Sequence, residues 1–235
     1  MPPIPPKAIL FDLDDTLWPI GPVIARAELL LHDWLGQHAP GVARQFSIDA
    51  LRQRRLALLE ERPQLLVDLG ELRRIGLLAA FEAAGEDVAK VEPAMALFQA
   101  ARNAVTPYAD VLPGLARLRG RVLLGSISNG VADLDVIGMA GHFTVSLAAR
   151  EFGRAKPDPA IFTAACAALG VAPAEAVYVG DDLRLDVAGA QNAGMRALWM
   201  NRRASSEHVA AGIRPDAICA SFDDLLRWLD GHAEE

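Results

Sequence analysis

The feature that most constrains this chain is a set of apolar runs of strand length that alternate with helical patterns. The clearest runs lie at 7–11, 121–128, 176–181 and 196–200, with weaker ones at 143–147 and 217–219. Continuous apolar strands are typical of a sheet that is buried on both faces. Helical patterns lie between the runs, at 113–119, 131–139, 159–169 and 183–193. The alternation predicts an α/β fold with a doubly wound parallel sheet.

The alternation disappears between residues 18 and 105, where Ala, Leu, Arg and Glu dominate four helical stretches: 23–35, 48–60, 65–84 and 93–103. We therefore expect an inserted α-helical cap subdomain at 18–105 and an α/β catalytic core made of 1–17 and 106–235. Open α/β sheets bind ligands at the carboxyl ends of their strands, so an insertion after the first strand is expected to act as a lid. A helical bundle that merely packs alongside is the alternative.

The composition favours an enzyme that acts on small molecules. The 235 residues are 52% hydrophobic and 23% charged, enough for one large domain or a core with an insertion. The net charge of −7 argues against a general nucleic-acid binder. No segment approaches the roughly 18 uninterrupted apolar residues of a membrane span. We expect a cytoplasmic protein with no nucleic-acid or membrane partner, and the oligomeric state is left open. Cys166 and Cys219 lack metal-ligand spacing and are expected to be buried, inert thiols.

An acidic segment follows the first apolar run directly. Asp12, Asp14 and Asp15 lie within four positions and precede the hydroxyl of Thr16. Side chains alternate along a strand, so Asp12 and Asp14 emerge on the same side, where both can converge on one substrate atom. Clustered like charges are tolerated mainly when a cation or a shared proton offsets their repulsion. The segment therefore indicates a divalent metal.

Three further segments fall at expected strand ends or helix starts on the same edge of the sheet. Ser128-Asn129-Gly130 suits a pocket whose donors hold anionic oxygens, although such triplets are often ordinary turns. Lys156 stands just before a proline-fixed helix start, although a single lysine is often a surface charge. The segment 180–186 places Asp181, Asp182 and Asp186 where a strand meets a helix. A helix N-cap alone explains one of these acids but not the set.

These four segments resemble, in order and spacing, the motifs of the haloacid dehalogenase-like hydrolases. The matching letters are DLDDT after the first strand, SNG after the second, a Lys-Pro-Asp-Pro element and GDDLRLD after a further strand. The resemblance covers almost the whole chain. It implies a Rossmann-like core and identifies the insertion with that family's helical cap of the first type.

The resemblance also implies a role for each motif residue. Asp12 would be the nucleophile that forms an aspartyl-phosphate, and Asp14 the general acid and base. Mg²⁺ would be held by the Asp12 carboxylate, the Asp14 main-chain carbonyl and Asp181, with Asp186 or Asp182 in support. The transferring phosphoryl oxygens would be stabilised by Ser128, the backbone of Asn129 and Gly130, and Lys156.

Asp14 also bears on the type of reaction. Family members that dehalogenate carbon acids lack this second acid, because a halide leaving group needs no proton, so Asp14 favours a phosphatase. A phosphomutase ranks lower, since its further cap base is not identifiable. The narrower similarity is to bacterial phosphatases acting on flavin mononucleotide and on 5-amino-6-(5-phospho-D-ribitylamino)uracil, and it implies a small phosphorylated metabolite as partner. A pyrimidine 5'-nucleotidase, a sugar-phosphate phosphatase and a catalytically idle ligand-binding or regulatory protein remain alternatives.

Two features of the insertion have no assigned role. The arginines at 52–55 and 73–74 could reach an anionic leaving group from a lid, but solvated helix faces carry similar runs. Trp18 could stack on an aromatic substrate or fill the joint between core and cap.

Overall fold

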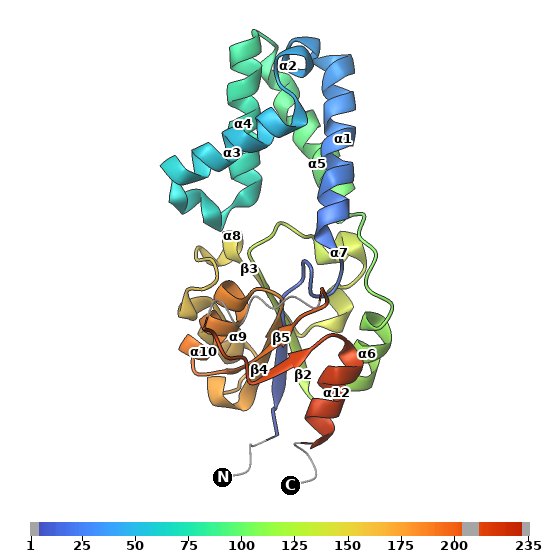
Figure 1. Ribbon diagram of the computed structural model, residues 1–235, viewed down its shortest axis with the longest axis vertical. Coiled ribbons are helices and arrows are strands. Elements are labelled where there is room, and N and C mark those ends of the chain that lie inside the picture. Colours follow the sequence, from blue (N-terminus) through green and yellow to red (C-terminus); the bar gives the residue numbers. More distant parts are fainter. Residues whose placement is uncertain (1–4, 204–211, 232–235) are drawn as a thin grey trace. The chain divides into compact units, whose positions relative to one another are not determined.

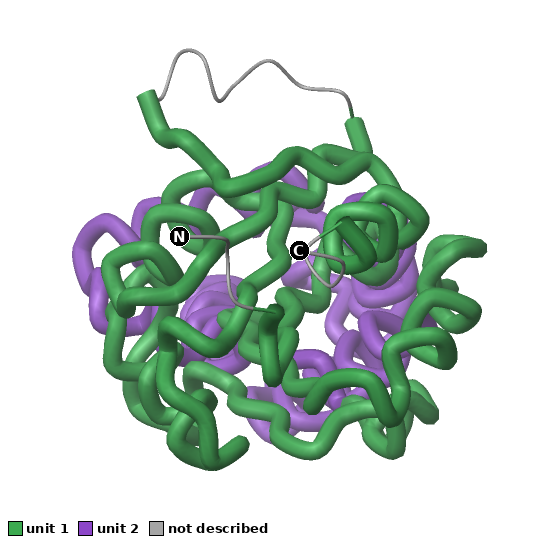
Figure 2. The backbone as a smooth tube through the Cα atoms, turned by 90° about the horizontal axis from the view of Figure 1, so that it is seen from below, with its two compact units in different colours: residues 1–19, 106–130, 134–235 green, residues 20–105, 131–133 purple. Residues whose placement is uncertain are grey.

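The computed structural model describes residues 5–203 and 212–231, and the chain divides into two compact units (Figure 2). Unit 1 consists of 1–19, 106–130 and 134–235, and unit 2 of 20–105 and 131–133. The residues 131–133 group with unit 2 because they bond to it: the Gln99 side-chain amide donates to the Val131 carbonyl at 2.6 Å, and Asp133 N–H donates to Asn103 Oδ1 at 3.2 Å.

Unit 1 is built on one six-stranded sheet in the order β3-β2-β1-β4-β5-β6. The strands are β1 (Ala8–Phe11), β2 (Leu123–Ser128), β3 (Val145–Ala148), β4 (Ala176–Gly180), β5 (Arg196–Met200) and β6 (Ala217–Cys219). Every neighbouring pair is parallel. The predicted α/β class and the parallel sheet are thus confirmed. The chain order reverses at β1, which pairs with β2 on one side and β4 on the other, and such switch points are where α/β sheets bind ligands.

Helices cover both faces of this sheet (Figure 1). On one face α6 (Val111–Leu118) packs against α12 (Phe222–Gly231), and the Phe222 ring stacks on Phe11 of β1 at 5.4 Å. On the other face α9 (Pro159–Ala168) packs against α10 (Gly189–Asn192) and closes a core that includes Leu10, Phe162 and Tyr178. Two short helices, α7 (Leu134–Ile137) and α8 (Ala149–Phe152), complete the unit together with the turns η3 (Ala140–His142), η4 (Pro173–Glu175) and η5 (Leu183–Ala188). Both cysteines are buried thiols.

Unit 2 is helical and has its own core. Its helices are α1 (Ile20–His38), α2 (Pro40–Gln45), α3 (Ile48–Glu61), α4 (Leu69–Ala84) and α5 (Val91–Asn103), with short turns η1 (Pro63–Val67) and η2 (Val88–Lys90). Leu31, Leu35, Phe81 and Phe98 are among the side chains buried between the helices. Within the described residues of the chain, no helix is both long and apolar enough to cross a membrane.

Two predicted helices have other forms in the structure. The stretch 65–84 is broken at Asp68, whose carboxylate accepts the Glu71 N–H at 2.9 Å and so starts α4 rather than continuing a helix. The stretch 183–193 begins as the π-helical turn η5 and becomes regular helix only from Gly189. Local hydrogen bonds from Asp side chains, which compete with helix propagation, account for both differences.

Candidate active site

Three of the predicted motifs meet at the carboxyl ends of the three central strands. Asp12 follows β1, Ser128 is the last residue of β2, and Asp181 follows β4. Asp12 also continues the pairing of β1, since its N–H donates to the Val179 carbonyl at 2.9 Å. The sheet register therefore brings these motif residues to one edge at the topological switch point.

Lys156 lies at the centre of the site. Its Nζ donates to Asp12 Oδ1 and Asp186 Oδ1, both at 2.6 Å, and to Tyr178 Oη at 2.9 Å. Burial alone lowers the pKa of this lysine, but the charges of Asp12 and Asp186 outweigh burial and hold that pKa well above its usual value. The Lys156 ammonium is therefore a fixed positive charge. Its backbone precedes a cis proline bond, and Asp158 caps α9 by accepting the Ala160 N–H at 2.9 Å.

The carboxylates of Asp12, Asp181 and Asp186 come together beside this lysine, with one oxygen of each within 4.8 Å of the others. Burial raises the pKa of Asp12 to about 7 and that of Asp181 to about 8, and the neighbouring carboxylates add to both shifts. One lysine does not offset three carboxylates. Clustered carboxylate oxygens are what a hard divalent cation such as Mg²⁺ prefers, so the donor set fits such an ion.

Gly180 allows this approach of the acids. A Cβ atom built on Gly180 would lie 2.3 Å from the Asp186 carboxyl carbon, a distance that real Cβ atoms do not show. The strand must therefore end in glycine for Asp186 to reach both Lys156 and the other two carboxylates.

Of the two acids expected to support the metal, Asp186 and Asp182, only Asp186 belongs to this group. Asp182 Oδ1 instead accepts the N–H groups of Arg184 and Leu185 at 2.8 and 2.7 Å, which caps η5. The backbone N–H of Asp182 donates to Asp186 Oδ2 at 3.0 Å. Asp182 therefore orients Asp186 through its backbone and uses its carboxylate for the turn.

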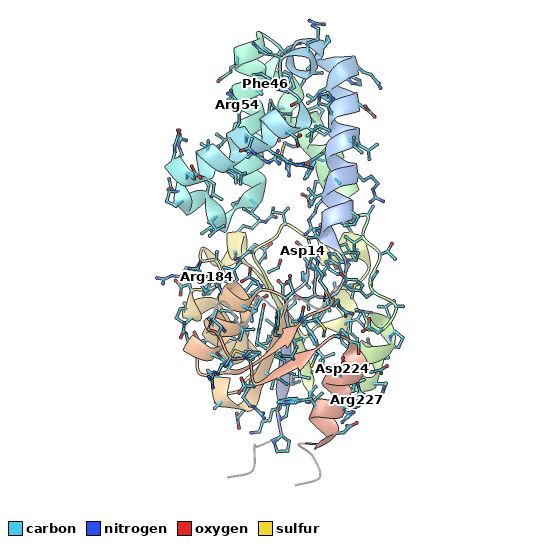
Figure 3. All side chains as sticks on the ribbon, viewed as in Figure 1. Asp14, Phe46, Arg54, Arg184, Asp224 and Arg227 are labelled. Atoms are coloured by element: carbon cyan, nitrogen blue, oxygen red, sulfur yellow. The ribbon has the colours of Figure 1, made fainter. Side chains whose placement is uncertain are left out.

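Asp14 lies beyond the end of β1, and its side chain is labelled in Figure 3. Its Oδ1 accepts the indole N–H of Trp18 at 2.8 Å. Trp18 is fully buried, and the possibility that it stacks on a substrate stays a prediction. On the other side of the loop, Thr16 Oγ1 donates to Asp12 Oδ2 at 3.3 Å. The loop thus supplies each of the two motif acids with a hydrogen-bond donor.

Ser128, Asn129 and Gly130 form a turn that is tied to the lysine segment. Ser128 Oγ accepts the Gly130 N–H at 2.9 Å. The Asn129 amide bonds the backbone of Lys156 twice, donating to its carbonyl at 2.9 Å and accepting its N–H at 2.8 Å. Asn129 therefore joins two motifs that are far apart in the sequence, and it positions Lys156 relative to β2.

Sequence reasoning missed two residues that hold the site together. Tyr178 lies within an apolar strand and carries no motif signal, yet its hydroxyl accepts from Lys156 and donates to the Ile127 carbonyl at 3.1 Å. Arg202, after β5, donates from Nε to the Thr16 carbonyl at 2.8 Å and from Nη1 to Asp110 at 3.2 Å. Neither contact follows from a local pattern, because each depends on how distant strands align.

Known proteins match this chain over most of its length. The model for haloacid dehalogenase-like hydrolases matches residues 6–194. The 5-amino-6-(5-phospho-D-ribitylamino)uracil phosphatase YigB of Escherichia coli is 32% identical over 83% of this chain and 83% of its own. The phosphoserine phosphatase of Thermus thermophilus is 35% identical over 92% of this chain and 94% of its own.

Two solved structures extend this likeness to the fold. A 2-haloacid dehalogenase from Pseudomonas syringae has a TM-score of 0.85 at 37% identity, over 94% of this chain and 99% of that chain. A HAD phosphatase from Thermococcus onnurineus has a TM-score of 0.71 at 28% identity, over 95% of this chain and 97% of that chain.

Proposed function

The chain belongs to the haloacid dehalogenase-like hydrolases, and from that premise we propose that it is a Mg²⁺-dependent phosphomonoesterase that hydrolyses a small phosphorylated metabolite through an aspartyl-phosphate. The observation that carries the proposal is the buried Asp12, held by Lys156 and grouped with Asp181 and Asp186. Asp14 follows it by two residues. Asp12 would thus serve both as nucleophile and, with Asp181 and Asp186, as part of the cation site, while Asp14 would be the proton donor.

In the first half of the proposed reaction, an Asp12 carboxylate oxygen attacks phosphorus and the bond from phosphorus to the ester oxygen breaks. Asp14 gives a proton to the leaving oxygen, so an alcohol departs and Asp12 carries the phosphoryl group. Lys156 and the Ser128 turn offer positive charge and donors to the phosphoryl oxygens. Asp12 and Asp181, with Asp186 beside them, would hold Mg²⁺, which when bound supplies charge neutralisation for the attack of one anion on another.

In the second half, Asp14 takes a proton from water, and the water oxygen attacks phosphorus. The bond between phosphorus and the Asp12 oxygen breaks, which releases inorganic phosphate and returns Asp12 as a carboxylate. Asp14 ends with the proton that it gave up in the first half. Each residue is thus restored after one turnover.

For the substrate we propose flavin mononucleotide or a phosphorylated riboflavin precursor, supported by the likeness to the E. coli enzyme named for such a compound. A pyrimidine nucleotide or a sugar phosphate is the alternative. The first experiment is phosphate release with Mg²⁺ from a panel of flavin mononucleotide, pyrimidine nucleotides, sugar phosphates, phosphoserine and phosphoglycolate, with an EDTA control. A strong preference for flavin mononucleotide supports the narrower assignment, and indiscriminate turnover would reduce it to the phosphatase class.

Dehalogenation is the second candidate, because a solved neighbour with 37% identity bears that name. Halide release from 2-chloropropionate, measured beside the phosphate panel, decides between the two reactions. We expect phosphate release alone, because Asp14 is needed only where the leaving group must be protonated. Release of neither product would favour a binding or regulatory protein that has kept the fold.

The covalent step has its own test. We expect Asp12→Asn to abolish phosphate release while the protein keeps its far-ultraviolet circular dichroism spectrum, since an amide is a poor nucleophile. A variant that still turned over at the wild-type rate would exclude the aspartyl-phosphate.

A further inference from the structure

Unit 2 contains a second group of buried charges. Glu28 of α1 is met by three arginines, Arg52 and Arg55 from α3 and Arg73 from α4, which we call the arginine cluster. Glu28 Oε2 accepts from Arg52 Nε and Oε1 accepts from Arg55 Nη2, both at 2.7 Å. Arg73 Nη1 lies 3.7 Å from Glu28 Oε1, which is beyond hydrogen-bond distance. Side chains from three helices thus bring three guanidinium groups around the single carboxylate of Glu28.

The charges of this group do not balance. The side chains of Glu28, Arg73 and Arg55 are 4%, 11% and 18% exposed, so water compensates them poorly. Asp49 adds one more carboxylate, but it is 83% exposed and pairs with Arg52 at the rim. Even with Asp49 counted, three guanidinium groups face two carboxylates. An excess of buried positive charge is costly unless an anion joins it.

Arg73 is the arginine of the cluster whose hydrogen-bonding capacity is least satisfied. Its Nη1 is buried and finds no hydrogen-bond acceptor within the described parts of the chain. The guanidinium carbon lies 3.5 Å from the centre of the Phe98 ring, so one face of the group is covered by carbon. Burial and the charge of Arg55 lower the pKa of Arg73 to about 9, as expected for a cation with too few partners.

Gly76 of α4 leaves room for the Arg55 side chain beside Glu28 and Arg73. A Cβ atom on Gly76 of α4 would lie only 3.2 Å from Arg55 Cγ, so the absence of a side chain lets the arginine stem lie against the helix. Glu28 already accepts hydrogen bonds at both oxygens. A cluster that served only to join helices would need no third guanidinium without an acceptor.

We propose that unit 2 binds an oxyanion, a phosphate or carboxylate group, between the guanidinium groups of Arg52, Arg55 and Arg73. Guanidinium donors form a planar fork that matches the paired oxygens of such groups. Arg52, which is 42% exposed, connects the cluster to the surface. The oxyanion can be a free inorganic ion or the anionic group of a small metabolite that binds unit 2.

The first test titrates sulfate into the full-length protein by calorimetry at constant ionic strength. We expect saturable binding that weakens at least tenfold in Arg73→Met and in Arg73→Lys, since lysine keeps the charge but lacks the fork. The matched control is Arg54→Met on α3, the helix that carries Arg52 and Arg55: Arg54 is exposed and lies over the Phe46 ring at 4.9 Å (Figure 3). It should leave sulfate affinity unchanged.

Equal sulfate affinity in wild type and Arg73→Met would place the bound ion elsewhere and overturn the proposal. If Arg73→Met fails to fold, judged by its thermal unfolding, Arg55→Met takes its place because Arg55 is more exposed. The titration needs no turnover, so its result stands even if no phosphate ester proves to be a substrate.

The second test repeats the titration with phosphate and with acetate to identify the chemistry of the oxyanion. Phosphate binding that is lost in Arg73→Met assigns the site to a tetrahedral oxyanion, and acetate binding that is lost in the same variant assigns it to a carboxylate. Absence of saturable binding of sulfate, phosphate and acetate to the wild-type protein would refute the site.

Discussion

At the scale of single residues, the two acids of the first motif differ in their partners. Asp12 contacts Lys156, whereas Asp14 accepts a hydrogen bond from Trp18. The charge of Lys156 favours the ionised form of Asp12, which a nucleophile needs. The two acids, although only two positions apart, thus have different surroundings, which agrees with the different tasks proposed for them.

Asp14→Asn tests the task of the second acid. The variant should slow hydrolysis of ethyl phosphate roughly a hundredfold, because the alkoxide leaving group then receives no proton. Its effect on formation of the phospho-enzyme from p-nitrophenyl phosphate should be much smaller, since p-nitrophenolate leaves readily without one. Rapid-mixing measurements of p-nitrophenol release, set beside ethyl phosphate turnover, provide the comparison. Equal losses on both substrates would count against a general acid.

Tyr178→Phe tests the support of Lys156. Removal of the hydroxyl takes one acceptor from the buried ammonium and leaves the Ile127 carbonyl without its side-chain donor. We expect the free energy of unfolding to fall by about 1–3 kcal/mol, measured by urea denaturation. Tyr108→Phe is the control, because Tyr108 is the other tyrosine of the chain and lies outside this network. A Tyr178→Phe loss no larger than that of the control would show that the hydroxyl is dispensable.

At the scale of elements, the junction between β4 and η5 decides where Asp186 lies. The Cβ atom of Gly180→Ala would lie 2.3 Å from the present position of the Asp186 carboxyl carbon and would force that carboxyl away, so we expect the Mg²⁺ concentration for half-maximal activity to rise roughly tenfold or more. Gly141→Ala, at a position with nothing within 4 Å, is the matched control. A Gly180→Ala protein with wild-type Mg²⁺ dependence would show that the junction tolerates a side chain.

Glu28 links α1 to α3 and α4, and it makes unit 2 sensitive to acid. Burial opposes its charge, but hydrogen bonds from Arg52 and Arg55 outweigh burial and lower the pKa of Glu28 below the usual 4.5. A pKa that is lower in the folded state contributes stability at pH values above about 4.5, and this contribution is lost as pH falls through the folded pKa.

Glu28→Gln should therefore unfold more easily than wild type at pH 7, by roughly 3 kcal/mol, because a buried pair is broken. The difference between the two proteins should shrink as the pH is lowered below about 4.5, because the unfolded chain then takes up a proton at Glu28 while the folded protein still holds the carboxylate ionised. Urea unfolding at several pH values gives this difference directly. If the difference in free energy of unfolding between the two proteins stayed constant down to pH 3, the pKa of Glu28 would be the same in the folded protein as in the unfolded chain.

At the scale of the whole molecule, the sequence predicted the sheet well because the signals of its strands are local. The apolar runs and their intervening helices follow from burial on both faces, so the parallel direction of the strands could be inferred, whereas their order in the sheet was not predicted. The meeting of Asp12, Asp181 and Asp186 was partly foreseeable, since parallel strands end at one edge. The role of unit 2 as a lid stays a prediction.

Other parts of the molecule had no signal in the sequence. The sequence could not decide whether Asp182 or Asp186 joins the carboxylate group, because both belong to the same motif. The answer depends on which carboxylate caps η5, and in the structure it is that of Asp182. The partners of Tyr178 and Arg202 depended on contacts across many residues. The arginines of unit 2 had the composition of an ordinary solvated face, and only their burial around Glu28 set Arg52, Arg55 and Arg73 apart from Arg54.

The strand order has a consequence for the time course of synthesis. β1 is made before the other five strands, yet Ala8 pairs with Leu123 of β2 and with Ala176 of β4, so its neighbours emerge more than a hundred residues later. Residues 20–105, which form nearly all of unit 2, lie between β1 and β2 in the sequence. The helices of unit 2 contact one another over shorter stretches of chain than β1 and its two partner strands do. Contacts that are close in sequence form sooner than distant ones. The strand that precedes the proposed nucleophile thus leaves the ribosome before the rest of the sheet and pairs with β4 only after about 165 further residues have followed.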